Sequence, residues 1–122
     1  MTATEFILII KQVVHDSTVN GCISLLEKPP GRKPSAKLVE LSHWFNQLND
    51  QDKEMIHSII ELASRQAIFG LLAVIDGVRQ IEDSKSKGTL ELRFNEVGNS
   101  LIINDPNEEY LHNLFNQQVP PI

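Results

Sequence analysis

Residues 50–83, DQDKEMIHSIIELASRQAIFGLLAVIDGVRQIED, decide the fold of this chain. The stretch contains no proline, is polar at both ends, and is nearly all apolar over residues 67–78. A helix that is apolar on all sides lies buried at the centre of a domain. The sequence therefore predicts a long central helix over residues 51–83, with Gly70 and Gly77 as points of close packing or a kink.

Two apolar patterns with different phases precede this helix. The first predicts a helix over residues 4–15, and Thr2 with Glu5 matches a capping box at its start. Its apolar residues are Phe6, Ile10, Val13 and Val14. Residues 19–26 also keep helical spacing, but at about 100° per residue their apolar side chains point about 180° away from the first set. We therefore expect either a break near residues 16–18 or one helix buried on both faces.

Proline and capping residues mark the next two boundaries. Residues 28–34, KPPGRKP, hold three prolines and a glycine, so they form a loop. From Ser35 the chain predicts an amphipathic helix, followed by a tight turn and a cap at Asn49 or Asp50. The apolar stripe of this helix is Leu38, Leu41, Phe45 and Leu48.

The period changes to two near the C-terminal end. Apolar residues alternate with polar ones over residues 90–95, and Gly98-Asn99 supplies turn chemistry, so residues 89–103 predict a two-stranded β-hairpin. Asp105 and Pro106 match a helix start, which predicts a short final helix over residues 106–117. The fold class is α+β, mainly helical.

Length and charge limit the classes of function. A chain of 122 residues fits one domain, residues 1–122. The net charge of −5 disfavours nucleic acid and anionic lipid as partners. Residues 49–84 carry seven acidic and three basic side chains, so much of the acidity lies in and around the central helix.

A reducing, cytoplasmic location is expected. Cys22 is the only cysteine, so no intrachain disulfide forms. The N-terminal residues have Glu5 where a secretion signal has cations. The longest uninterrupted apolar run, residues 67–75, is less than half of the roughly 20 residues that span a bilayer, so no membrane span is expected.

The C-terminal two thirds of the chain, residues 44–115, resembles a family of small bacterial proteins of unknown function. The resemblance rests on the order of three features: a long helix whose apolar run ends in Asp-Gly, a hairpin, and a short final helix. These match Asp76-Gly77, residues 89–103 and residues 105–115. The resemblance implies this element order and a bacterial origin, and it implies no activity.

Asp76 and Arg79 are the most interesting polar pair. They lie one turn apart in the apolar end of the predicted helix, where a carboxylate needs a partner that an arginine at i+3 can supply. One interpretation is an acid or ligand-binding group at the base of a pocket. The alternative, which we favour, is a structural ion pair or a bond from Asp76 to nearby loop backbone.

A second set of residues suggests a surface for a partner protein. Trp44 is the only tryptophan and lies beside the apolar stripe, as either the edge of the core, which we favour, or an exposed interface anchor. Asp50, Asp52 and Glu54 form an acidic group at the start of the central helix. The histidines are dispersed, and no motif for a metal, a cofactor or a catalytic nucleophile is present.

Three hypotheses of function follow. The first, which the sequence favours, is a non-enzymatic protein-interaction module of the inhibitor, immunity-like or adaptor type, with another protein as partner. The second is a small-ligand binder or enzyme that uses Asp76 and Arg79. The third is a homo-oligomeric structural protein whose hairpin edges pair across subunits.

Overall fold

The elements follow the order expected for a mainly helical α+β chain. A computed structural model describes residues 1–81 and 88–122. The elements are α1 (Ala3–Ile9), the π-helix η1 (Ile10–Asp16), α2 (Ser17–Glu27), α3 (Ala36–Asn46), α4 (Asp50–Ile75), β1 (Arg93–Glu96), β2 (Asn99–Ile102) and α5 (Leu111–Gln118).

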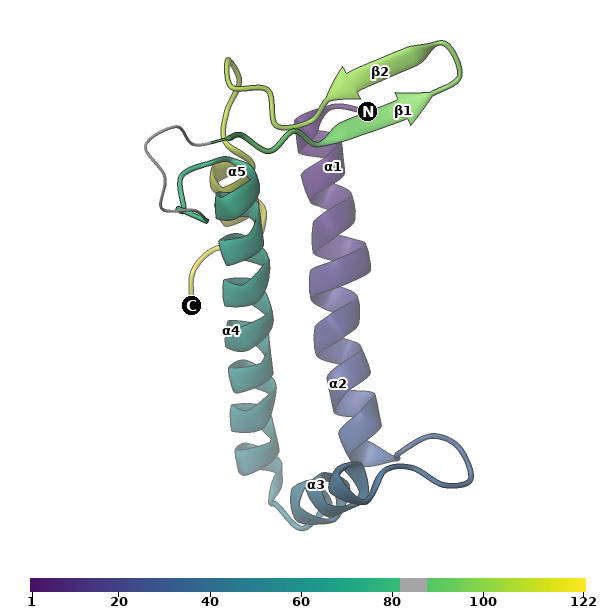
Figure 1. Cartoon of the computed structure of the whole chain (residues 1–122). Helices are drawn as coiled ribbons and strands as arrows, with labels where there is room; N and C mark the ends of the chain where they lie inside the picture. The colour runs from purple at the N-terminus through teal and green to yellow at the C-terminus, as the bar shows by residue number, and fades with distance from the viewer. Residues whose placement is uncertain (82–87) are drawn as a thin grey trace.

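Two long helical segments run side by side and define the shape of the molecule (Figure 1). The elements α1, η1 and α2 continue into one another as a single rod, and α4 runs antiparallel beside it. At one end α3 crosses between the two, and at the other end lie the hairpin and α5. The predicted capping box is confirmed, because Thr2 Oγ1 accepts from Glu5 N at 3.1 Å and Glu5 Oε2 accepts from Thr2 N at 3.2 Å.

The π-helix explains the two phases of the N-terminal pattern. Instead of breaking near residues 16–18, the rod passes through η1, whose wider turns hold more residues than α-helical turns and so change the direction in which later side chains point. The inward face therefore runs through Ile7, His15 and Val19. Val13 and Val14, which the α-helical spacing placed on the buried face, are exposed.

The central helix is confirmed, but it ends at Ile75 rather than at 83. Gly77 has φ +80°, and the backbone N–H groups of Gly77 and Val78 donate to the carbonyls of Val74 and Ala73. These two bonds form a Schellman motif, in which glycine takes the left-handed conformation that closes a helix. At the other end Asn49 caps the helix, since its Oδ1 accepts from Asp52 N at 2.8 Å. Residues 82 and 83 of the expected helix lie outside the described residues.

The hairpin is confirmed and is tied to the end of α4. β1 and β2 pair antiparallel, with Glu96 opposite Asn99. The two-residue turn is therefore Val97-Gly98 and not the predicted Gly98-Asn99, because Asn99 pairs as the first residue of β2. Asn104 fixes the base of the hairpin. Its Nδ2 donates to Ile75 O and Leu90 O, both at 2.9 Å, and its Oδ1 accepts from Leu92 N at 2.8 Å.

The final helix is present but begins at Leu111, five residues later than predicted. The stretch that was predicted to start it forms a turn, in which Asp105 accepts from Asn107 N through Oδ1 and from Glu108 N through its carbonyl. The Asp105 side chain therefore stabilises a turn instead of capping a helix, as Asp side chains commonly do. The N-cap position of α5 is Tyr110, which makes no side-chain capping bond.

The core lies at the hairpin end of the molecule. Its buried residues are Ile7, Leu72, Ile103, Leu111 and Phe115, so α1, α4, α5 and the residue after β2 all contribute. The opposite end buries much less, with Phe45 of α3 and Val19 of α2 as its buried hydrophobic residues within the described part of the chain. The long central helix is consequently less buried than its sequence suggests, and Leu71 within the apolar run is 59% exposed.

The end of α4 can be tested with two glycines. Gly77→Ala is expected to lower the free energy of unfolding by about 1–2 kcal/mol, because a Cβ is disfavoured at positive φ. Gly21→Ala is the matched control. This glycine lies inside α2 with open space around its missing Cβ, so alanine is expected to stabilise by about 0.5–1 kcal/mol. Urea denaturation measures both, and changes of the same sign would contradict the assigned helix end.

Candidate functional site

Asp76 caps the start of α5 from a distant part of the chain, because the residue at the N-cap position, Tyr110, makes no side-chain capping bond. Its side chain is 2% exposed, and its two carboxylate oxygens accept from the backbone N–H groups of Leu111 at 3.1 Å and His112 at 2.9 Å. Asp76 Oδ2 also accepts from His112 Nδ1 at 2.6 Å. The first N–H groups of a helix have no partner within the helix, so a carboxylate placed there satisfies them and also favours the helix dipole.

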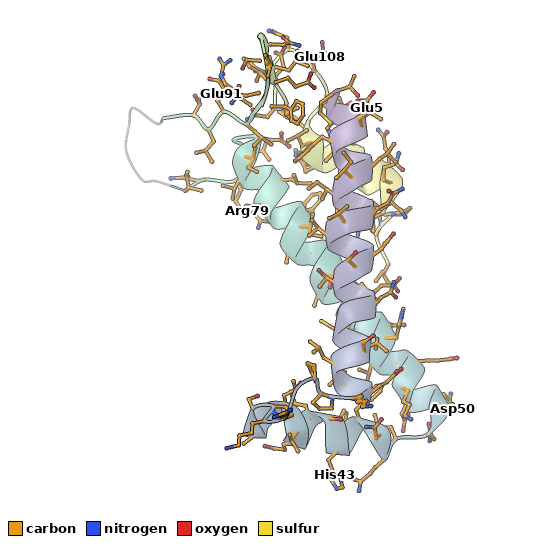
Figure 2. All side chains as sticks on the ribbon, turned by 90° about the vertical axis from the view of Figure 1, so that its right-hand side faces the viewer. Glu5, His43, Asp50, Arg79, Glu91 and Glu108 are labelled. Carbon is orange, nitrogen blue, oxygen red and sulfur yellow. The ribbon has the colours of Figure 1, made fainter. Side chains whose placement is uncertain are left out.

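Arg79 is not the partner of Asp76. Its guanidinium lies over α4 at Gly70, where an added Cβ would come within 2.5 Å of Arg79 Nη1. Figure 2 shows Arg79 beside the upper end of α4. The ion pair expected from the i, i+3 spacing is therefore absent from the described residues, and Gly70 serves as the close-packing point that the sequence suggested. His112 packs instead against Phe69 and Tyr110, with ring centroids 5.4 and 5.2 Å apart.

The predicted partner-binding residues lie at the end of the molecule away from the hairpin. Asp50 and Asp52 occupy the first turn of α4, where acidic side chains also stabilise the helix dipole. Figure 2 shows Asp50 at the far end of α4 from Arg79. Trp44 is 53% exposed, so it belongs to the surface of α3 and not to the edge of the core.

An apolar stripe continues along α4 next to these acidic residues. Met55, Ile59 and Leu62 are 61%, 57% and 45% exposed. Their i, i+4, i+7 spacing places them on one face of the helix. Ile60 and Ser64, which are partly buried, lie on the other side of the helix, toward the rod. The stripe was not anticipated, because periodicity alone does not tell which apolar face of a helix has a partner.

The molecule exposes more surface than a compact chain of its size. Its accessible area is 8654 Å², whereas a compact monomer of 13.8 kDa exposes about 6,600 Å². The excess of about 2,000 Å² exceeds the roughly 800 Å² that each partner contributes to a stable interface. Among the described residues, twenty large apolar or aromatic side chains are exposed and eight hydrophobic residues are buried.

By length and composition alone, α4 is also apolar enough to cross a membrane, and 22% of its most apolar 18-residue window is buried in the structure. Core helices of soluble proteins meet the same criterion. Arg65, in the middle of α4, is buried and donates to three oxygen atoms of the protein.

A cavity with both charged and apolar lining lies between the rod, α4 and the C-terminal segment. It has a volume of about 260 Å³ and is lined by Lys11, His15 and Asp16 from η1, by Glu61 and Arg65 from α4, and by residues 118–120 and Ile122. A second hollow of about 220 Å³ shares His15, Asp16 and Glu61 with it and reaches His57. The cavity lies where the rod is π-helical, and π-helical turns frequently mark functional sites.

His15 and Asp16 form a dyad in the cavity wall. His15 Nδ1 donates to Asp16 Oδ1 at 2.9 Å, and Lys11 Nζ lies 2.9 Å from Asp16 Oδ2. The hydrogen bond from His15 holds the pKa of Asp16 below its ordinary value of 3.8, with help from Lys11 and against the opposing effect of burial. His15 is 5% exposed, and its Nε2 is buried without a hydrogen-bond partner in the described part of the chain.

Arg65 is a buried cation without a buried anion. It is 5% exposed, and its Nε donates to Val119 O at 3.0 Å while its two terminal nitrogens donate to Gln66 Oε1 and Asn116 Oδ1. All three acceptors are neutral. Among the described residues no carboxylate forms an ion pair with Arg65, although buried charges are normally paired.

Comparison with protein-family models, with curated proteins and with solved structures gave no match for this chain. The resemblance of residues 44–115 to a bacterial family therefore remains an expectation.

Sequence reasoning missed the cavity and the partner of Asp76. One signal for the cavity was present, because Arg65 is the only Lys or Arg between Lys53 and Arg79, in a helix that is otherwise mostly apolar. A lone cation at such a position needs partners from elsewhere in the chain. No comparable signal pointed to His112, because it is separated from Asp76 by 36 residues.

The Asp76 cap can be tested by a double-mutant cycle. Asp76→Ala is expected to destabilise the protein by about 2–3 kcal/mol, because it leaves two backbone N–H groups of α5 and the His112 side chain without their acceptor. His112→Ala in the Asp76→Ala background is expected to cost less than in the wild type, since their shared bond is already lost. Strictly additive losses in chemical denaturation would show that the pair contributes nothing.

The His15–Asp16 dyad predicts a dependence of stability on pH. A carboxyl whose pKa is lower in the folded chain stabilises the fold above its unfolded value, and this contribution is lost as the pH falls through the folded value. The wild type is therefore expected to exceed Asp16→Asn in stability at neutral pH, and the difference is expected to shrink below the ordinary value of 3.8. Urea denaturation of both proteins at a series of pH values measures this difference. A constant difference would contradict the assigned interaction.

Proposed function

We propose that the protein is a non-enzymatic protein-interaction module that binds another protein through the outer face of α4. The apolar stripe of Met55, Ile59 and Leu62 carries this proposal, because these side chains are about half exposed or more on a helix whose opposite face packs on the rod. Contiguous exposed apolar surface in a small protein marks an interaction site. The excess accessible area supports an interface of ordinary size.

The charges beside the stripe favour a basic partner over a second copy. Residues 50–54 carry three acidic side chains and one basic side chain. A second copy of this chain along the same segment would place acidic side chains next to acidic side chains, which repel each other. A different protein with basic side chains around an apolar surface would instead form ion pairs with these acidic residues. Trp44, on the neighbouring helix α3, adds an exposed aromatic of the kind that anchors interfaces.

A location in a reducing compartment, the cytoplasm, is part of the same proposal, because Cys22 is the sole cysteine and no disulfide supports the fold.

Without a disulfide, the stability of the chain depends on the core at the hairpin end, the helix caps and the hydrogen bonds of Asp76.

The stripe can be tested by substitution. Ile59→Lys is expected to weaken binding of a partner captured from a native lysate by at least about tenfold, because it places a charge at the centre of the apolar face. The change should leave thermal stability nearly unaltered, because Ile59 is 57% exposed. Titration of the purified partner measures the affinity.

Val97→Lys is the matched control, because Val97 is fully exposed at the turn of the hairpin, far from the stripe. Equal affinity of the Ile59→Lys variant and the wild type would exclude the α4 face. Changing Asp50, Asp52 and Glu54 to lysine tests the acidic residues beside the stripe separately. Unchanged affinity of this variant for the captured partner would exclude contact between these residues and basic groups of the partner.

Self-association through the hairpin is the second candidate. All four residues of β2 are exposed, including Leu101 and Ile102, and the described sheet has only two strands, so each strand keeps one unpaired edge. Such an edge is a template for pairing with another chain. Analytical ultracentrifugation at micromolar concentration decides this candidate, because a monomer would rule it out and would leave the α4 proposal untouched.

A further inference from the structure

Glu61 and Arg65 of α4 carry opposite charges and are spaced along the helix to pair with each other. Glutamate four residues before arginine is the favourable order for an ion pair on a helix. Here Arg65 instead turns to Val119 O and Asn116, and no hydrogen bond or ion pair reaches the Glu61 carboxylate from the described residues. Both side chains line the same cavity. One wall thus carries a cation and an anion that have no ion-pair partner among the described residues, four residues or about 6 Å apart along the helix axis.

The remaining polar groups of the cavity include one more acceptor without a partner in the part of the chain that the structure describes. His15 donates through Nδ1 to Asp16, so in the neutral ring Nε2 is an acceptor, and it is buried without a partner in the described residues. Asp16 is already satisfied by His15 and Lys11. Guanidinium N–H groups suit a carboxylate, whereas the carboxylate of Glu61 and the acceptor nitrogen of His15 suit an ammonium group.

The volume of the cavity and its apolar lining residues restrict the class of ligand further. The volume of about 260 Å³ is below the range of roughly 300–1,000 Å³ for drug-sized ligands. Val119, Pro120 and Ile122 supply an apolar wall beside the charged groups. A small molecule that presents a carboxylate, an ammonium group and a short apolar side chain matches all three parts of this lining.

We propose that this cavity binds a small apolar amino acid, with its carboxylate against Arg65 and its ammonium group against Glu61. The two charged groups of an amino acid sit on one carbon, so hydrogen bonds from both of them span about one helical turn. The inference is independent of the α4 interaction face, since the cavity lies on the side of α4 that packs against the rod.

The test uses L-valine and two isosteres, each of which lacks one charged group. Isovalerate keeps the carboxylate and loses the ammonium group, and isobutylamine keeps the ammonium group and loses the carboxylate. L-valine is titrated into ¹⁵N-labelled protein, and saturable shifts are expected in the amides of residues 11–16, 61–65 and 118–119. Each isostere is expected to bind at least about tenfold more weakly, because it forfeits a charge-assisted hydrogen bond.

Glu61→Gln provides the decisive variant, because the Glu61 carboxylate makes no described hydrogen bond or ion pair whose loss would unfold the protein. It is expected to weaken L-valine binding about tenfold and to leave isovalerate binding unchanged. Glu40→Gln on α3, whose carboxylate is exposed and paired with Lys37, is the control and should change neither affinity.

Three outcomes would overturn the proposal. The first is no saturable shift with L-valine up to about 10 mM, a limit that corresponds to negligible affinity. The second is equal binding of either isostere and L-valine, which would show that one of the two charged groups is not recognised. The third is unchanged L-valine binding by Glu61→Gln, which would remove the ammonium site. None of these outcomes bears on the α4 face.

Discussion

The end of α4 is the junction on which the rest of the structure depends. Asp76 there accepts three hydrogen bonds from the start of α5, and the carbonyl of the neighbouring Ile75 accepts one from Asn104. A helix end exposes carbonyls without partners and a helix start exposes N–H groups without partners. Placing both ends at one point, with Asp76 and Asn104 between them, satisfies these groups where water is largely excluded.

This junction also explains where the core forms. Once α5 is capped by Asp76, Leu111 and Phe115 face Leu72 of α4 and Ile7 of α1. The hairpin is tied down by Asn104 and brings Ile103 to the same cluster. Hydrophobic burial is therefore concentrated at one end of two long helical segments, and the other end stays open. The exposed stripe of α4 follows from this uneven distribution, because none of the elements in residues 1–81 and 88–122 covers the outer face.

Between the two ends, polar residues of the rod and of α4 line the cavity. His15 and Arg65 are both 5% exposed. In the described part of the chain His15 Nε2 has no hydrogen-bond partner, and Arg65 has only neutral acceptors. Burial of such groups costs free energy. Both residues line the cavity beside η1, and this placement is what supports the proposed amino-acid site.

Local chemistry was read correctly where a few neighbouring residues decide the outcome. The capping box of Thr2 and Glu5, the cap at Asn49, the proline loop before Ser35 and the hairpin near Gly98 all depend on contacts within a few residues. The helix start predicted at Asp105 failed for a related reason. A turn and a helix cap use the same side-chain acceptor, and only the distant Asp76 decides that the helix begins at Leu111.

The sequence by itself therefore determined the α+β class, the order of the elements and most helix starts, because periodicity and caps act over one or two turns. The tertiary structure alone decided that Asp76 bonds His112 instead of Arg79, that a π-helix rotates His15 inward, and that the apolar stripe on the outer face of α4 is exposed. Each of these outcomes depends on groups that meet in space from segments far apart in the chain, or on which apolar face finds a partner. Periodicity contains neither kind of information, because it records how residues are spaced along a helix and not what lies opposite them.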